Sequence, residues 1–500
     1  MLAARGVWVL CLLCACDAGS SDLAGRACSA DLECESYACV GDPAAAQADL
    51  AELPLSCGML RETRAPGSAC ESAEDCDHGV CLLAGACARS CRGGGDCGPA
   101  QRCQASYARA EPERLASLHA CVDALNLPSD AQHSESTGEV HGAVDRLTLP
   151  LTAAHTLYVV EHLSDDSWPI PASSSLCRPP LCARKLTTQA DPEHALFDVQ
   201  TLAEADDGQD NPVAQGNHVN PLTVWTPNGP RSLAAPRAYQ LEVESKRQGR
   251  ARITALWRES SGVRLDLNVF YLGALTLQAD TARGPELFAR ALDELDSIFE
   301  PAGIFVGEVR FIVVPGQLPT RGSGLPGREV SAGFRNLVSQ YQVLPELPEL
   351  FRLSAGASNS ALDVFCVADI AAAGGAEVGG IAGGTPVAFG MHGTAGSGIA
   401  LAVDRWLTRQ DPVGLGHALA HEVGHALGLF HTTEVNGLVI DPLPDTPTCP
   451  LSRDVDRNGS LDAAECAALG GDNLMFPTTD GGSRLSPEQI AVLQRALILN

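Results

Sequence analysis

Three histidines and one glutamate lie close together between residues 421 and 431, in the sequence HEVGHALGLFH. Residues four apart share one face of an α-helix, so His421 and His425 can present two imidazoles to one metal ion. Glu422 is rotated by about 100° from His421 and can reach the open side of that ion. The spacing therefore predicts a metal site on a helix, with a carboxylate beside it.

A third protein ligand requires the chain to turn after this helix. Gly428 can adopt the left-handed conformation that ends a helix, and the turn would let His431 supply a third nitrogen. Three neutral imidazoles leave the fourth position of a tetrahedral Zn²⁺ ion to water, as in catalytic zinc sites. We expect Glu422 to be the general base that accepts a proton from this water. His417, which no glutamate follows, is interpreted as structural or as supporting a ligand.

The motif resembles the zinc signature of the metzincin metallopeptidases. Metzincins also carry a methionine turn beneath the zinc, and Met475 in the sequence NLMFP (473–477) fits it. The sequence DTP at 445–447 and the Asn-x-Met form of the turn are similar to the pappalysin and cytophagalysin branch. The resemblance covers residues 264–500 and implies a Zn²⁺ cofactor, a protein or peptide substrate, and a twisted mixed sheet above an active-site helix.

Two features depart from the metzincin pattern. Many metzincins place tyrosine two residues after the methionine of the turn, where it helps to stabilise the oxyanion, but this chain has Pro477. Zinc and Glu422 must then carry more of that task, or another donor does. The second departure is an insert at 449–466, between the third histidine and the methionine turn.

The insert contains the pattern of an EF-hand calcium loop at 454–465, DVDRNGSLDAAE. Such a loop needs oxygen ligands at positions 1, 3, 5, 7, 9 and 12 and glycine at position 6. The ligand positions are filled by Asp454, Asp456, Asn458, Ser460, Asp462 and Glu465. Because Pro450 lies where an entering helix would be, we expect a structural Ca²⁺ loop closed by a Cys449–Cys466 disulfide; the alternative is a solvated acidic turn.

The elements that would position these residues alternate between strand and helix. Asp411 and Pro412 are typical of a helix start, and we expect the zinc-binding helix to run to Leu427. Upstream, the pattern predicts a strand over 265–272, a helix over 284–300 and a buried strand over 304–314. Further strands are expected at 361–370 and 399–403, and a final helix after Ser486. This alternation predicts an α/β domain.

Twelve of the 20 cysteines fall between residues 28 and 121. The spacing Cys-x5-Cys-x4-Cys occurs at residues 28–39 and again at 70–81, which indicates an internal repeat. Twelve is an even number, so six disulfides could form in an oxidising compartment. We interpret the repeats as structural or docking modules, with a specific ligand-binding or inhibitory role as the alternative. Cys366, in the sequence LDVFCV, is interpreted as a buried thiol.

Residues 1–16 have the pattern of an export signal. Arg5 is followed by an apolar run that is too short to span a bilayer, and small residues close the segment. The sequence LCAC at 13–16 resembles a bacterial lipobox, which would make Cys16 the lipidated first residue of the mature chain. An ordinary cleaved signal is the alternative. The expected location is therefore the bacterial cell envelope, as a lipoprotein, or the extracellular medium.

The composition limits the class of partner. Lys and Arg number 34 against 61 Asp and Glu, so the formal net charge is −27. Such acidity opposes binding to nucleic-acid phosphates and anionic lipid surfaces. We expect no nucleic-acid partner, and membrane contact only through the lipid anchor; the oligomeric state is not predicted.

The chain is expected to be multidomain. We expect a cysteine-rich region at 22–124, a linker at 125–142, a β-rich and sandwich-like domain at 143–260 with a Cys177–Cys182 disulfide, and a metzincin-like α/β domain at 264–500. The expected function is a zinc endopeptidase. The alternatives are a weak or inactive metzincin-like adhesin or binding lipoprotein, and a propeptide within 22–260.

Overall fold

The structure is a computed structural model. It describes residues 27–28, 38–41, 55–58, 60, 63–92, 94–111, 114–141, 144–149, 156–163, 181–188, 191–198, 222–226, 239–245, 248–258, 262–272, 283–314, 336–338, 347–371, 377–439, 441–478 and 481–500. The expected signal, the lipidation site Cys16 and residue Cys177 of the expected Cys177–Cys182 disulfide lie outside these residues. None of the helices described is long and apolar enough to cross a membrane.

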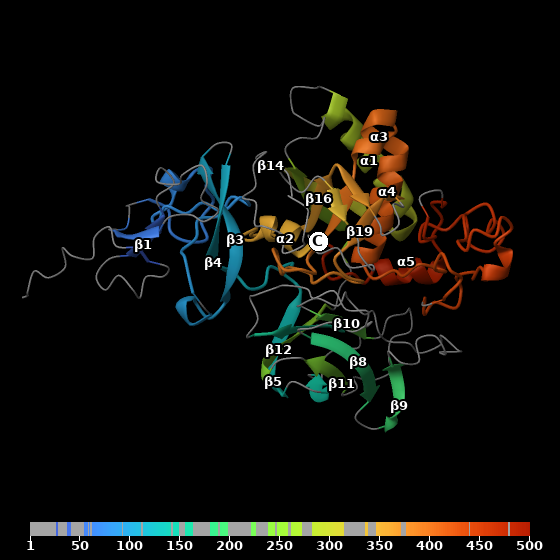
Figure 1. Cartoon of the computed structure of the whole chain (residues 1–500), viewed down its shortest axis with the longest axis horizontal. Coiled ribbons are helices and arrows are strands. Elements are labelled where there is room, and N and C mark those ends of the chain that lie inside the picture. The colour runs from blue at the N-terminus through green and yellow to red at the C-terminus, as the bar shows by residue number, and fades with distance from the viewer. Residues whose placement is uncertain are drawn as a thin grey trace, which may run out of the picture.

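The chain forms a multidomain α/β structure with several β-sheets and a disulfide-rich N-terminal region (Figure 1). In Figure 1 the disulfide-rich region is blue and the strand-rich middle region is green. The helices and sheet of the C-terminal half run from yellow to red. The bounds of the elements follow with each part.

A five-stranded mixed sheet forms the centre of the C-terminal half, in the order β14-β13-β16-β20-β19. The first four strands are mutually parallel, and β19 is antiparallel to β20. Every residue of β16 and β20 is buried, because apolar side chains cover both faces of a central strand. The strands are β13 (Arg264–Leu272), β14 (Phe305–Val314), β16 (Leu362–Val367), β19 (Gly380–Ala382) and β20 (Gly398–Ala402).

Two long helices, α1 (Arg283–Phe299) and α4 (Pro412–Ala426), contribute to the same apolar core as this sheet. Phe288, Leu295 and Phe299 on α1 are all buried, which agrees with the face predicted from their spacing. Cys366 is a buried free thiol in β16, as predicted. The predicted bounds of both helices are confirmed to within one residue.

The strand β14 differs from its prediction as a buried strand. It pairs with β13 along one side and is an edge strand of the sheet. Phe311 and Val313 are 54% and 62% exposed. The apolar run suggested burial, but a run of this kind cannot distinguish a central strand from an edge strand, because the order of strands depends on distant segments.

The middle region contains two four-stranded sheets, β10-β7-β12-β5 and β6-β11-β8-β9, whose buried side chains share one core. The expected linker at 125–142 is corrected here, because ten of its residues form the strand β5 (Gln132–His141). In β5 only Val140 is buried, and most of the other side chains are polar. The composition of this strand therefore resembles that of a linker. The other strands are β6 (Val144–Leu149), β7 (Thr156–His162), β8 (Leu181–Thr188), β9 (Asp191–Asp198), β10 (Leu222–Thr226), β11 (Tyr239–Ser245) and β12 (Gln248–Trp257).

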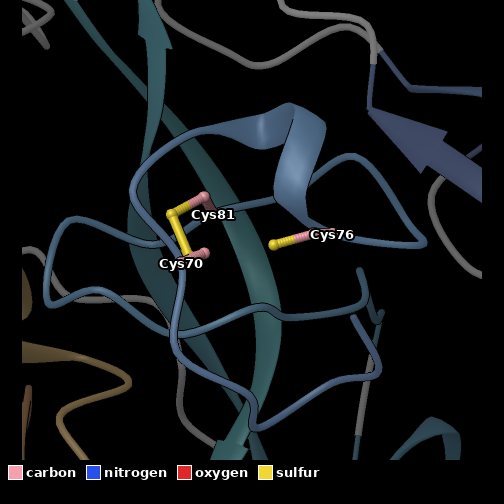
Figure 2. A group of neighbouring side chains, drawn as sticks. All are labelled: Cys70, Cys76 and Cys81. Carbon is pink, nitrogen blue, oxygen red and sulfur yellow. A yellow bond between two sulfur atoms is a disulfide. The ribbon is translucent and has the colours of Figure 1, made fainter. Parts of the chain in front are cut away.

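Disulfides replace regular structure in much of the N-terminal region. Cys70 pairs with Cys81, and Cys76 lies beside this disulfide (Figure 2). Cys76 pairs with Cys87, and the two residues of each pair are 11 positions apart. Further disulfides join 28 to 39, 91 to 103 and 97 to 121. The strands here are β1 (Ala38–Gly41), β2 (Leu55–Gly58), β3 (Gln101–Glu111) and β4 (Arg114–Asp123). A disulfide network stabilises a region that has too few apolar residues for a large core.

The remaining elements are short. The strands β15, β17 and β18 form a small three-stranded sheet, and α2, α3 and α5 flank the larger sheet and the C-terminal loops. Their bounds are β15 (Asn336–Val338), α2 (Leu347–Phe351), β17 (Asp369–Ala371), β18 (Glu377–Val378), α3 (Asp404–Arg409) and α5 (Pro487–Leu493).

Candidate metal centre

The helix α4 holds the central part of the site. Its first turn is fixed by Asp411, whose side chain accepts a hydrogen bond from the backbone N–H of Gly414 at 2.9 Å. Its end is fixed by Gly428, which has φ of +109° and whose N–H donates to the carbonyl of His425. The chain then turns back, so that His431 faces the two histidines of the helix.

The three histidines predicted as ligands lie together. Nε2 of His431 is 3.2 Å from Nε2 of His421 and 3.0 Å from Nε2 of His425. The ring centroids of the three imidazoles lie 4.6 to 5.2 Å apart. All three rings therefore direct Nε2 toward one point.

The hydrogen bonds on the other side of each ring determine which nitrogen carries the proton. Nδ1 of His421 contacts the carbonyl of Leu474 at 2.7 Å, and Nδ1 of His425 contacts the carbonyl of Leu429 at 2.7 Å. A carbonyl only accepts hydrogen bonds, so both Nδ1 atoms are donors. Nδ1 of His431 likewise donates to a carboxylate oxygen of Glu434 at 3.1 Å. In the neutral rings all three Nε2 atoms are then unprotonated.

The surroundings of the histidines favour their neutral form. Burial, followed by the neighbouring His431, lowers the pKa of His421 to about 3. The same two causes, with the contribution of His421, hold the pKa of His425 well below its ordinary value. Three unprotonated nitrogens that point at one another repel, and a cation between them removes that repulsion. The arrangement thus favours a bound metal ion.

The donor set fits Zn²⁺ in particular. Imidazole nitrogens about 2.0–2.1 Å from a tetrahedral zinc ion would lie about 3.3 Å from one another, close to the separations observed here. Each ring is also oriented by a hydrogen bond from Nδ1, which is typical of histidine ligands. Among the described residues, the other clusters of three or more His, Cys, Asp or Glu side chains are two groups of disulfide-bonded cysteines and the acidic loop at 454–465.

Glu422 lies on α4 beside the cluster and is only 6% exposed. Burial raises the pKa of Glu422 to about 8, partly offset by a hydrogen bond from the backbone of Ala382. Its Oε2 atom has no hydrogen-bond partner among the described residues. A nearby cation would lower this pKa and restore the carboxylate. A buried carboxylate of this kind can exchange a proton with a bound water or substrate.

The strand β19 lies directly against Glu422. A Cβ atom on Gly380 would lie 2.4 Å from Cγ of Glu422, so a larger residue at this position would displace the carboxylate. Ala382, two residues later, supplies the backbone hydrogen bond to Glu422. This contact was not predicted, because nothing in the local sequence indicates that a Gly-Ile-Ala strand meets the helix that carries Glu422.

The predicted methionine turn lies under the cluster. Met475 is fully buried, and a Cβ atom on Gly424 of α4 would lie 2.6 Å from its sulfur. Its carbonyl accepts a hydrogen bond from the backbone of Thr432, and its own N–H donates to the side chain of Asn473. The turn therefore joins α4 to the segment that carries His431, and it also supplies the Leu474 carbonyl that orients His421.

His417 and Glu434 complete the account of the surrounding residues. His417 contacts the carbonyl of Gly482 rather than the cluster, which agrees with its interpretation as a structural residue. Glu434 was missed by the sequence analysis, although it lies only three residues after His431. An acidic residue next to a ligand histidine is a signal that could have found it.

The acidic insert has the backbone conformation of a compact loop. Oxygen atoms of Asp454, Asp456 and Glu465 lie within 4.8 Å of one another. Asp454 accepts hydrogen bonds from the backbone N–H groups of Asn458 and Gly459, and the latter residue has φ of +81°. The predicted Cys449–Cys466 disulfide is present and joins the two ends of the insert.

The remaining predicted calcium ligands hydrogen-bond within the loop itself. Asn458 accepts from the N–H of Ser460 at 2.7 Å, and Asp462 accepts from the N–H of Glu465 at 2.8 Å. These hydrogen bonds fix the side chains of Asn458 and Asp462 within the loop. Desolvation raises the pKa of Asp454, but hydrogen bonds from the backbone of Gly459, Arg457 and Asn458 and from the side chain of Asp456 together outweigh it and hold this pKa below its usual range.

Comparisons with known proteins do not identify a family for this chain. No family model matches it, and no curated protein matches it. Matches to solved structures exist. One, described as "Structure of a chaperone-substrate complex", has a TM-score of 0.25 and 13% sequence identity, and spans 51% of this chain and 37% of the other.

Proposed function

We propose that the chain is a zinc-dependent endopeptidase of the metzincin type. The observation that carries this proposal is the convergence of three unprotonated Nε2 atoms, from His421, His425 and His431, beside the buried carboxylate of Glu422. The resemblance of the motif and of Met475 to the metzincin pattern supports it. Residues 264–500 would then be a metzincin-like catalytic domain, and residues 143–260 a sandwich-like domain.

The roles of the residues follow from their positions. His421, His425 and His431 would hold the ion through Nε2. When bound, zinc would supply a Lewis acid that activates water and polarises the scissile carbonyl. Glu422 accepts the proton of the attacking water and returns it to the leaving amine. Ala382 holds the carboxylate of Glu422 in place through its backbone hydrogen bond.

The insert 454–465 is proposed to bind Ca²⁺ as a structural ion. The carboxylates of Asp454, Asp456 and Glu465 provide hard oxygen ligands at the spacing of an EF-hand loop. The export signal and the disulfides support an extracellular or cell-envelope location, with lipidation at Cys16. The proposed partner is a protein or peptide substrate.

The test is hydrolysis of casein by the full chain loaded with zinc. We expect hydrolysis that a chelator abolishes and that added zinc restores. Glu422→Gln, which keeps the shape of the side chain but loses the base, should bind zinc and lower kcat by about two to four orders of magnitude. Glu308→Gln, on the exposed part of β14, is the matched control and should remain active.

Two results would contradict the proposal. If Glu422→Gln retained the wild-type rate, this residue would not be the base. If the zinc-loaded wild type hydrolysed neither casein nor gelatin, the alternative of an inactive adhesin or binding lipoprotein would be favoured instead.

A further inference from the structure

The loop between β19 and β20, residues 383–397, connects the strand beside Glu422 to the centre of the sheet. We call it the clamp loop. Val387, Phe389 and Met391 are buried in the main core, and the N–H of Val387 donates to the carbonyl of Ala426 at the end of α4. The clamp loop therefore contacts the helix that carries the candidate ligands and continues directly from the strand that holds Glu422.

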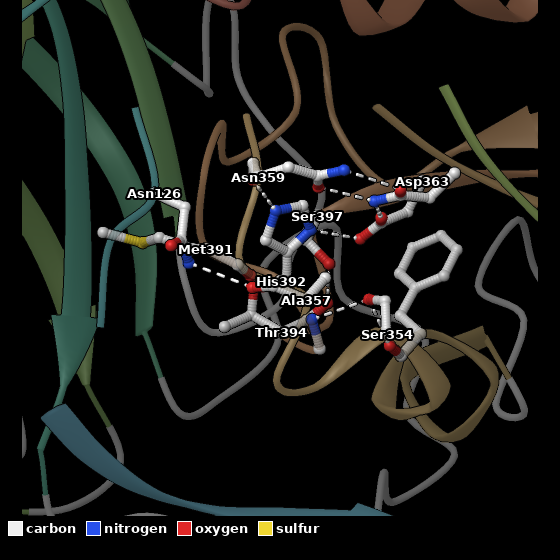
Figure 3. A network of polar contacts seen from close by, with 12 residues as sticks. Asn126, Ser354, Ala357, Asn359, Asp363, Met391, His392, Thr394 and Ser397 are labelled. Carbon is white, nitrogen blue, oxygen red and sulfur yellow. Dashed lines mark hydrogen bonds and ion pairs between the residues drawn. The ribbon is translucent and has the colours of Figure 1, made fainter. Parts of the chain in front are cut away.

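Side chains from the N-terminal half of the chain bind this loop. Gln104 and Arg102 on β3 both donate to the carbonyl of His392, at 3.2 and 3.4 Å. The N–H of Asn126 donates to the carbonyl of Gly390 at 2.8 Å. Figure 3 shows Asn126 reaching this part of the loop from the opposite side to Asp363.

The β-rich region supplies a further contact to the same loop. The hydroxyl of Thr223 on β10 donates to the carbonyl of Pro386 at 2.9 Å. Arg102 also forms an ion pair with Glu161 on β7 at 3.1 Å, and Glu161 in turn pairs with Arg252 on β12. Arg102 thus joins the disulfide-rich region, the β-rich region and the clamp loop.

The clamp loop packs closely against β3 at Gly393. A Cβ atom on Gly393 would lie 2.2 Å from Nε2 of Gln104 and 2.7 Å from Cβ of Ala355. Gly393 has φ of +75°, a conformation that other residues rarely adopt. Glycine at position 393 therefore lets the backbone of the clamp loop pack against Gln104.

The side chain of His392 fixes the same loop to the sheet. Its Nδ1 lies 2.7 Å from a carboxylate oxygen of Asp363 on β16, and its Nε2 lies 2.5 Å from the carbonyl of Asn359 (Figure 3). Asn268 on β13 donates to both Asp363 and the side chain of Asn359. The sheet therefore holds the side chain of His392 through Asp363, whereas Arg102 and Gln104 hold its backbone carbonyl.

We propose that Arg102 and Gln104 are positioning residues that hold the clamp loop, and through it β19, so that Glu422 is placed for proton transfer. The inference rests on the proposed function. The steps are the two hydrogen bonds to the His392 carbonyl, the direct continuation of the clamp loop into β19, and the contacts of Gly380 and Ala382 with Glu422. On this proposal the region that carries Arg102 and Gln104 belongs to the active enzyme.

The experiment compares Gln104→Ala and the double variant Gln104→Ala/Arg102→Gln with the wild type, each as the full zinc-loaded chain. We expect kcat per bound zinc to fall about tenfold or more in the double variant, because small displacements of a catalytic group are costly. KM should change less, and the zinc Kd should stay unchanged, because the three ligand histidines do not contact these residues. Hydrogen exchange of the amides in β19 should become faster.

The matched control is Gln132→Ala, which removes the exposed hydrogen bond from Trp257, the last residue of β12, and should leave kcat unchanged. If the double variant does not fold, the single variant Gln104→Ala tests the inference, and its kcat should fall a few-fold. Unchanged kcat per bound zinc and unchanged exchange in β19 would overturn the inference, and so would a loss of zinc affinity without an effect on exchange. A wild type without peptidase activity would refute the proposed function. In that case, hydrogen exchange of the β19 amides alone would show whether Arg102 and Gln104 hold the clamp loop.

Discussion

At the scale of single residues, the hydrogen bonds of Nδ1 determine what the histidine cluster can bind. Two of the acceptors are main-chain carbonyls, of Leu474 and Leu429, which no substitution removes. The third is the carboxylate of Glu434, which fixes the orientation of the His431 ring. His431 is therefore the ligand whose orientation depends on one replaceable side chain.

We expect Glu434→Ala to weaken zinc binding by about 10-fold to 100-fold, because the His431 ring loses its orienting acceptor. Glu434→Gln keeps a hydrogen-bond acceptor without the charge and should lose less affinity. Competition with a chromophoric chelator measures the zinc Kd directly. Equal zinc affinity in Glu434→Ala and the wild type would show that the contact does not support the ligand.

At the scale of elements, the insert 454–465 is a loop held by hydrogen bonds within it and by a disulfide. Asp454 and Glu465, at its two ends, bind backbone N–H groups inside the loop, and the Cys449–Cys466 disulfide closes it. The hydroxyl of Ser486, the first-turn cap of α5, contacts Asp445, shortly before the insert. The loop itself is bound to the segment after His431, because the N–H of Leu461 donates to the carbonyl of Val435 at 2.7 Å.

Calcium should raise the thermal stability of the full chain, because an ion that binds only the folded state stabilises it by about 2.7 kcal/mol at one hundred times its Kd. Asp456→Ala removes one oxygen ligand and should abolish most of the increase in Tm. Asp472→Ala, an exposed acid outside the loop, is the control and should keep it. A calcium-dependent Tm that is the same in Asp456→Ala and the wild type would refute the site.

At the scale of the whole molecule, the parts of the chain share their cores. Leu157 and Trp225 of the β-rich region belong to the same apolar cluster as α1 and α4. Leu83 and Tyr107 of the disulfide-rich region belong to the cluster that contains Phe351 and β16. Arg102 joins these parts through polar contacts, and the buried His392–Asp363 pair lies next to it.

The stability of this junction should depend on pH through His392. Burial and the charge of Arg102 lower the pKa of His392. The charge of Asp363 and the hydrogen bonds of His392 with Asp363 and with the Asn359 carbonyl raise it and outweigh them, so the pKa lies above its ordinary value. A histidine whose pKa is raised on folding stabilises the folded state fully below the unfolded pKa of about 6.5, and this stabilisation is lost as the pH rises through the folded pKa.

His392→Gln removes this contribution. The difference in free energy of unfolding between the wild type and this variant should be largest near pH 5.5 and should decrease above about pH 6.5. Urea denaturation at several pH values measures the difference, and His133→Gln, in the exposed strand β5, is the control. A difference that stayed constant or increased with pH would show that His392 is not charged in the folded state.

The sequence by itself determined the local features of this protein. The bounds of α4, the common face of His421 and His425, the turn at Gly428 and the spacing of the acidic loop all depend on residues within a few positions of one another. Helical periodicity, capping and loop stereochemistry act over the same short range, so they can be predicted from the chain alone. The disulfide that closes the insert could be predicted for the same reason, because Cys449 and Cys466 are only 17 positions apart.

Only the tertiary structure decided which distant segments meet. It placed Leu474 and Glu434 behind the ligands, β19 against Glu422, β14 at an exposed edge, and β3 against the clamp loop. These contacts depend on the order of strands and on the packing of separate cores, which many sequence positions determine together. A polar strand such as β5 resembles a linker until its partner β12 is known, because backbone pairing requires no apolar side chains.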